Sequence, residues 1–113
     1  MKQYNINEFM EYSEAKFTKR IIFKEGGSVV FMLNFKPGQE LPAHKHPGTN
    51  VHLLVLEGEG TFKINGTGVK AKQRDTILCT GEEELAFVND GDRNTSLYVV
   101  LNSIPDERYA QSI

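Results

Sequence analysis

Short runs of β-forming residues, separated by turn-forming residues, recur at intervals of about 8 to 12 residues along most of this chain. The runs that we predict as strands span residues 17–23, 29–35, 52–56, 61–64, 69–71, 76–79, 85–88 and 96–101. Between two of them lies Asn65-Gly66, a pair that favours the positive φ angles of a two-residue hairpin turn. This rhythm predicts an all-β fold of antiparallel strands, arranged as a sandwich or barrel.

Three segments differ from this rhythm. Residues 5–13 predict a short N-terminal helix, because Asn5 or Asn7 can cap it and its apolar residues share one helical face. The run 52–56 is apolar at nearly every position, so we expect a second sheet or a partner chain to cover its outer face. Residues 104–113 carry a proline and several charges, and we expect a loosely attached tail.

The 113 residues suit one domain, and we assign residues 1–113 to it with a core at about 17–102. A net charge of −2 provides no basic surface for nucleic acid. No run of 18 apolar residues predicts a membrane span, and the polar start resembles no signal peptide, so we expect a cytoplasmic protein. The single cysteine, Cys79, excludes an internal disulfide framework. No glycine-rich loop precedes a helix, so we expect no nucleotide cofactor.

All three histidines of the chain lie within one short stretch, at His44, His46 and His52. On an extended segment, residues i and i+2 point to the same side, so His44 and His46 can direct two imidazoles into one cavity. Imidazole nitrogen is a common ligand for transition metals. The pair therefore predicts a pocket with two convergent nitrogen donors; the alternative is two exposed loop histidines beside Lys45.

The residues around this pair resemble the first motif of the cupin superfamily, a family of small jelly-roll β-barrels. That motif reads glycine, five residues, histidine, one residue, histidine, and later a glutamate and a glycine. Here Gly38, His44, His46 and Gly58 match it, whereas Val51 stands at the glutamate position. The resemblance covers about residues 31–101.

The second cupin motif is degenerate in this chain. Arg74-Asp75 resembles its usual Gly-Asp turn, and Cys79-Thr80-Gly81 stands where Pro-x-Gly is expected. The segment 85–89 resembles the part that normally begins with the third metal-binding histidine, but Leu85 stands at that position.

The resemblance implies a metal site of three histidines and one glutamate, of which this chain retains His44 and His46. Two neutral imidazoles form a weak chelate, since catalytic zinc sites normally use three protein ligands and a water. The metal would be a divalent transition ion such as zinc, iron, manganese, nickel or copper. His52 and Glu84 are the nearest additional donors, although strand alternation places His52 opposite Val51, where a packing or interface role is favoured.

The sequence thus predicts a single-domain, cupin-like jelly-roll β-barrel with a short N-terminal helix, forming a homodimer. Two functions remain open. One is a small-molecule-binding cupin with a weak, incomplete metal site; the other is a metal-dependent cupin enzyme of the dioxygenase, isomerase or decarboxylase type. For the binding protein, the predicted pocket residues are His44, His46, Val51, Leu53, Phe62 and Leu85. For the enzyme, His44 and His46 would be metal ligands, and Glu84 or His52 would complete the shell.

Overall fold

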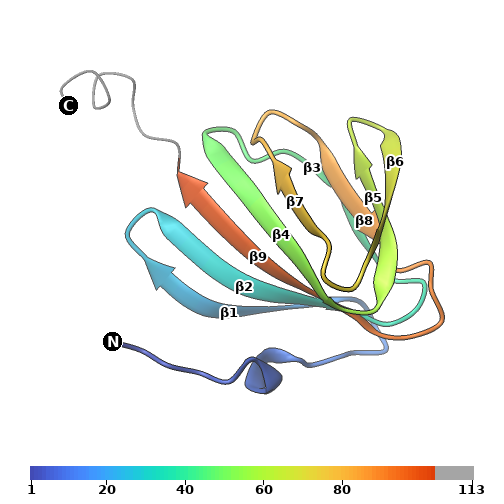
Figure 1. Ribbon diagram of the computed structural model, residues 1–113, viewed down its shortest axis with the longest axis horizontal. Coiled ribbons are helices and arrows are strands. Elements are labelled where there is room, and N and C mark those ends of the chain that lie inside the picture. Colours follow the sequence, from blue (N-terminus) through green and yellow to red (C-terminus); the bar gives the residue numbers. More distant parts are fainter. Residues whose placement is uncertain (104–113) are drawn as a thin grey trace.

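Two antiparallel β-sheets face each other in the computed structural model, which describes residues 1–103 (Figure 1). One sheet has five strands in the order β1-β2-β9-β4-β7, and the other has four in the order β3-β8-β5-β6. The elements are η1 (Ile6–Phe9), β1 (Thr18–Glu25), β2 (Ser28–Phe35), β3 (Glu40–His44), β4 (Thr49–Glu57), β5 (Glu59–Ile64), β6 (Thr67–Lys72), β7 (Thr76–Cys79), β8 (Leu85–Val88) and β9 (Thr95–Ser103). The predicted tail at 104–113 lies outside the described residues.

The all-β prediction is confirmed, and each predicted strand overlaps an observed one. Asn65 and Gly66 have φ angles of 51° and 81°, the turn geometry that their residue types favour between β5 and β6. β3 was not among the predicted strands. None of the helical segments in residues 1–103 is long and apolar enough to cross a membrane.

The prediction of a closed barrel is wrong, because the two sheets remain separate at their edges. Two edge strands explain this. β3 contains Pro42, which has no N–H to donate, and its pairing with β8 shifts register between Leu41 and His44. β7 has only four residues. The result is a two-layer sandwich rather than a barrel.

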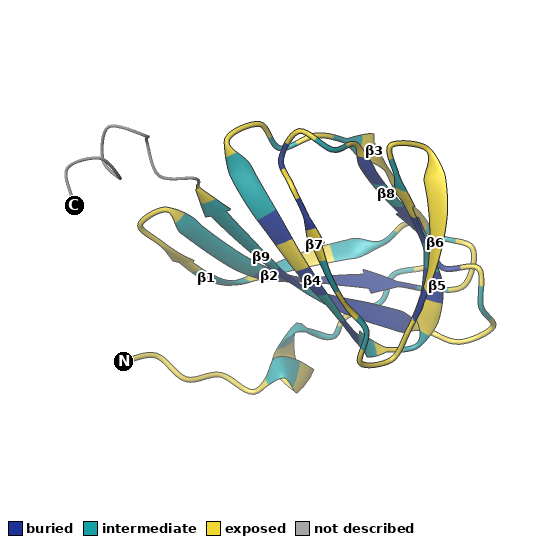
Figure 2. Cartoon of the chain, turned by 45° about the horizontal axis from the view of Figure 1, so that its top comes forward, coloured by how far each residue is buried: buried dark blue, intermediate teal, exposed yellow. Residues whose placement is uncertain are grey.

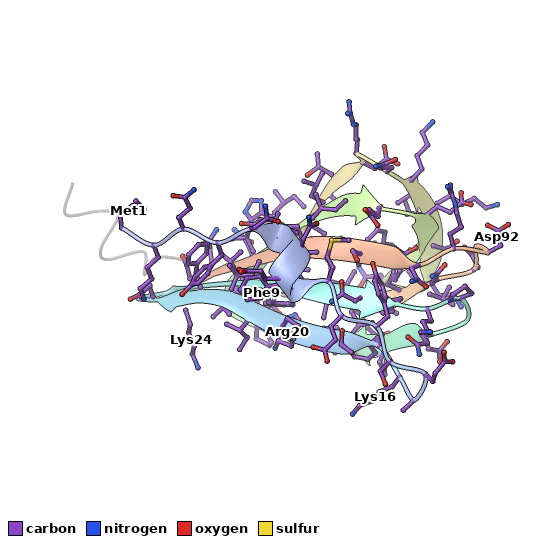
Figure 3. The ribbon with its side chains drawn as sticks, turned by 90° about the horizontal axis from the view of Figure 1, so that it is seen from below. Met1, Phe9, Lys16, Arg20, Lys24 and Asp92 are labelled. Carbon is purple, nitrogen blue, oxygen red and sulfur yellow. The ribbon has the colours of Figure 1, made fainter. Side chains whose placement is uncertain are left out.

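The predicted N-terminal helix over 5–13 is also wrong, since the structure has only the 3-10 turn η1, capped by the Asn5 side chain. The segment beyond the turn bonds to the outer face of the five-stranded sheet instead (Figure 3). Asn34 donates to the carbonyl of Phe9, and the Tyr12 hydroxyl bonds to Ser96. These contacts outweigh the weak tendency of so short a segment to form a helix.

An aromatic cluster closes one end of the space between the sheets. Phe87 lies with its ring centroid 5.0 Å from that of Phe35 and 4.7 Å from that of Phe62, and all three are buried. The buried segments of both sheets face each other across this core (Figure 2). Toward the other end, the two sheets present mostly aliphatic side chains together with Phe31, and the packing opens into a cavity.

Candidate functional site

The cavity between the sheets has a volume of about 130 Å³. Nine apolar and three basic side chains line it, and they are Phe17, Lys19, Phe31, Leu33, Leu41, His44, His46, Val51, Leu53, Leu85, Val99 and Leu101. No aspartate or glutamate is among these residues. The cavity wall is therefore hydrophobic, and the only polar side chains among these lining residues, Lys19, His44 and His46, are basic.

Strand register brings these side chains together. In the five-stranded sheet, Val51 pairs with Leu101 and Phe31 pairs with Val99, so these side chains share the inner face. In the facing sheet, Leu85 pairs with His44. Because alternate residues of a strand point to the same side, Leu33, Leu53 and Val99 also face the cavity.

The imidazoles of His44 and His46 lie against each other at the cavity, with ring centroids 4.5 Å apart and planes at 79°. The Nδ1 atom of His44 lies 2.7 Å from the carbonyl oxygen of Pro42. Because a carbonyl oxygen can only accept, Nδ1 carries a proton and donates it, and Nε2 is the ring nitrogen that remains for another partner.

His46 follows the end of β3 and is held by its backbone. Its N–H donates to the carbonyl oxygen of Gly81 at 3.0 Å, and its own carbonyl accepts from Thr49 at 3.0 Å. A Cβ atom on Gly81 would lie only 2.0 Å from the His46 carbonyl oxygen, so only glycine permits this approach. Burial, helped by the nearby charges of His44 and Lys19, lowers the pKa of His46 and favours the neutral ring.

Lys19 is the third basic residue at the cavity, and the sequence interpretation missed it. It pairs with Leu33, so its side chain begins on the inner face of β1. Its ammonium lies 4.5 Å from the ring centroid of Phe31. Alternation in residues 17–23 was the available signal, because it places Lys19 on the same face as Phe17.

The structure brings together five of the six predicted pocket residues, and these are His44, His46, Val51, Leu53 and Leu85. Phe62 is fully buried in the aromatic cluster and does not line the cavity. Sequence reasoning also missed most of the apolar wall, because β1, β2 and β9 could be positioned only once their register was known.

The additional donors lie away from the histidine pair. His52 is exposed on the outer face of β4, between the buried Val51 and Leu53. Glu84 is exposed in the turn before β8, where its N–H donates to the Asn65 side chain. Cys79 is buried, and burial, with a smaller effect of Glu83, raises the pKa of its thiol.

A metal centre requires more donors than these. Within residues 1–103, no group of three or more histidine, cysteine, aspartate or glutamate side chains is arranged to hold a metal ion. Hydrocarbon side chains of Val51 and Leu85 occupy the cavity wall next to the two imidazoles. The described residues therefore do not fit a metal centre with three protein ligands.

One shallow surface hollow of about 270 Å³ lies over β3, β5 and β8, and two larger ones, of about 490 and 430 Å³, lie near the turn between β4 and β5. Both are lined by charged residues of both signs, and they share Glu59 and Lys72. Small-molecule sites are usually concave, mostly apolar and fitted with few polar groups. The smaller cavity beside the histidines has this character, so we take it as the candidate site.

The sequence model of the cupin domain matches residues 31–101, which include every strand that lines the cavity except β1. The chain belongs to the cupin domain family. The resemblance stated from the two motifs is thereby confirmed.

Comparison with individual proteins gives more distant likenesses. The 5-nitrosalicylic acid 1,2-dioxygenase of a Bradyrhizobium species is 30% identical over 64 residues, a match that covers 57% of this chain and 30% of that protein's length. The TT1209 protein of Thermus thermophilus superposes with a TM-score of 0.86 at 19% identity, covering 93% of this chain and 100% of that one. A conserved Klebsiella pneumoniae protein with a double-stranded β-helix domain gives 0.85 at 21%, covering 91% and 90%. At these identities, the superpositions establish the fold alone.

Proposed function

We propose that this cupin binds a small organic molecule in the cavity between its sheets, with only a weak and incomplete divalent metal site at His44 and His46. The observation that carries the proposal is the composition of the cavity wall, which is apolar except for three basic side chains. Such a wall desolvates the body of a ligand and leaves a few polar groups to orient it.

The cavity also limits the size of the ligand. An apolar cavity of about 150 Å³ in another protein holds one benzene molecule. At about 130 Å³, this cavity accommodates a ligand body of similar size, with polar substituents extending past the histidines toward solvent.

The alternative is a metal-dependent enzyme of the dioxygenase, isomerase or decarboxylase type. The match to 5-nitrosalicylic acid 1,2-dioxygenase favours it, although that match spans less than a third of the dioxygenase. The donor set counts against it, because Val51 and Leu85 replace two expected ligands with hydrocarbon. We therefore rank binding first.

We also propose a homodimer formed through the outer face of the five-stranded sheet. Leu78 is 60% exposed there, and it pairs in register with His52, which is also exposed. Leu54, on the same face, is only half-buried. A partner copy over this face would cover these side chains, which agrees with one of the two expectations for the apolar run 52–56.

Two measurements on protein purified without a histidine tag test the main proposal. Elemental analysis should find far less than one metal ion per chain; stoichiometric metal that disappears in the variant carrying both His44→Ala and His46→Ala would favour the enzyme. NMR titration with benzene, benzyl alcohol and benzoate should show that at least one probe binds.

A cavity-filling variant provides the matched test. Val51→Phe should abolish binding of the probe by occupying the cavity, whereas Val69→Phe, the same change at a position that is 41% exposed on β6, should not. If no probe binds the parent chain, or if Val51→Phe binds as well as the parent, the cavity is not the binding site.

A further inference from the structure

We propose that the ligand is a small monocarboxylate, whose apolar body occupies the cavity and whose carboxylate binds between Lys19, His44 and His46. This inference rests on the proposed function, because it names the class of molecule for the same cavity. It assigns Lys19, on a strand outside the residues matched by the cupin domain, as a specificity-determining residue.

The first argument is the charge of the cavity wall. Its three polar side chains are a lysine and two histidines, and no carboxylate accompanies them. The ion pairs found within residues 1–103 join Lys2 to Glu25, Arg20 to Glu11 and Lys36 to Glu14. Lys19 takes part in none of them. Lys19 is exposed at the edge of the cavity, so water solvates its ammonium, and an anion that binds there would add a charge partner that the described part of the chain does not place at the cavity.

The second argument is the position of Lys19. Three other lysine or arginine side chains form salt bridges on the surface, whereas Lys19 starts on the inner face and passes over the Phe31 ring at the cavity. The lysine stem can pack on apolar wall while the ammonium stays near solvent. An anion held there would remain partly hydrated while the rest of the ligand is buried.

The third argument is the size and the number of donors. A carboxylate has two oxygens, and Lys19 together with one histidine N–H supplies a donor for each. The Nδ1 atom of His44 already bonds to the Pro42 carbonyl, so Nε2 is the nitrogen of this ring that remains for the ligand or for water. A cavity of about 130 Å³ has room for a six-membered ring or a short alkyl chain, but not for a large anion.

Lys19 also has a purely structural explanation. An inward-pointing charge on an edge strand discourages pairing with another chain, and β1 is an edge strand. That explanation predicts aggregation when Lys19 is replaced, with no change in ligand affinity of the remaining soluble protein. Binding measurements therefore separate the two.

The experiment compares benzoate with benzyl alcohol, an uncharged molecule of nearly the same shape, and with benzylamine, a cation. Affinities are measured by calorimetry on the full chain, with and without a chelator that removes metal ions. We expect benzoate to bind at least tenfold more tightly than benzyl alcohol, with or without chelator, and benzylamine to bind most weakly. In Lys19→Met, benzoate should lose at least threefold in affinity while benzyl alcohol changes less than twofold.

Lys63→Met is the matched control, since Lys63 is exposed on β5 next to the inward-facing Phe62 and therefore lies on the outer face of the other sheet. This variant should leave all affinities unchanged. Equal binding of benzoate and benzyl alcohol would overturn the carboxylate inference and leave the proposed function intact. Benzoate binding that disappears with the chelator would overturn it as well, because the carboxylate would then depend on a metal. If no probe binds, the proposed function itself fails.

Discussion

Gly81→Ala is the substitution that most directly tests how the fold holds the histidine pair. The added Cβ would lie 2.0 Å from the His46 carbonyl oxygen and 2.3 Å from that of Thr49. Both neighbours are backbone atoms, so no side-chain rotation can relieve the overlap. Because Cβ contacts below 3.0 Å essentially never occur, the His46 segment must move by at least 3.0 − 2.0 = 1.0 Å relative to Gly81.

That movement has an energetic cost that can be estimated. Overpacking of a dense interior typically costs about 1–3 kcal/mol. The hydrogen bond from the His46 N–H to the Gly81 carbonyl would also be strained or lost, at about 0.5–1.5 kcal/mol. We therefore expect Gly81→Ala to lower the free energy of unfolding by about 2–4 kcal/mol. Ligand affinity of the folded fraction should fall at least tenfold, because the His46 ring moves with its backbone.

Urea denaturation monitored by circular dichroism measures the first effect, and calorimetry with the best-binding probe measures the second. Gly68→Ala is the matched control, since its nearest neighbour would be a Thr61 methyl at 3.7 Å, an ordinary contact. Gly68 lies in β6, where alanine should be neutral or slightly stabilising. If Gly81→Ala changes stability by less than about 0.5 kcal/mol, the range of ordinary surface substitutions, the close approach described here is wrong.

Three further predictions concern the metal donors, the core and the outer face. The variant carrying both Val51→Glu and Leu85→His should bind zinc at least tenfold more tightly than the parent, about 1.4 kcal/mol, because both positions line the cavity beside the histidine pair; competition with a coloured chelator measures this, and an unchanged affinity would contradict the assigned positions. Phe87→Ala should cost about 3–5 kcal/mol in urea denaturation, since the ring is buried against two other aromatic rings, and a loss below about 1 kcal/mol would show that the cluster is not tightly packed. If the chain forms the proposed homodimer, Leu78→Asp should convert it to a monomer in light scattering with little change in monomer stability, and a dimer that persists would place the interface elsewhere.

Strand positions could be predicted from the sequence because their signals are local. Asn65-Gly66 adopts the turn that its residue types favour, and β7 and β8 have the predicted bounds. The N-terminal segment could not be predicted in this way. Its conformation depends on Asn34 and Ser96, which lie far along the chain and bond to it only in the folded state.

The site shows the same division. Val51 and Leu53 could be assigned to the inner face because alternation along one strand determines their direction. Alternation with Phe17 could likewise have placed Lys19 on the inner face, but its contact with Phe31 on the neighbouring strand depends on the strand register. The role of Gly81 could not be predicted, because it depends on a backbone contact with His46, which lies far away in the sequence. The prediction of a closed barrel was wrong for a related reason. Closure depends on pairing between the edge strands of the two sheets, and the pattern within a single strand does not determine this pairing.

The separation of the interior into a packed ring cluster and a cavity has a practical consequence for engineering. The ring cluster of Phe35, Phe62 and Phe87 provides much of the tight packing, whereas ligand selection falls to side chains further along the same strands. A library randomised at Lys19, Val51 and similar wall positions can therefore search for new binding preferences while the portion that maintains cooperative folding stays untouched. Changes at the exposed Lys19 should leave the melting temperature nearly unchanged, whereas changes at the buried Val51 should do so only when the side-chain volume is conserved.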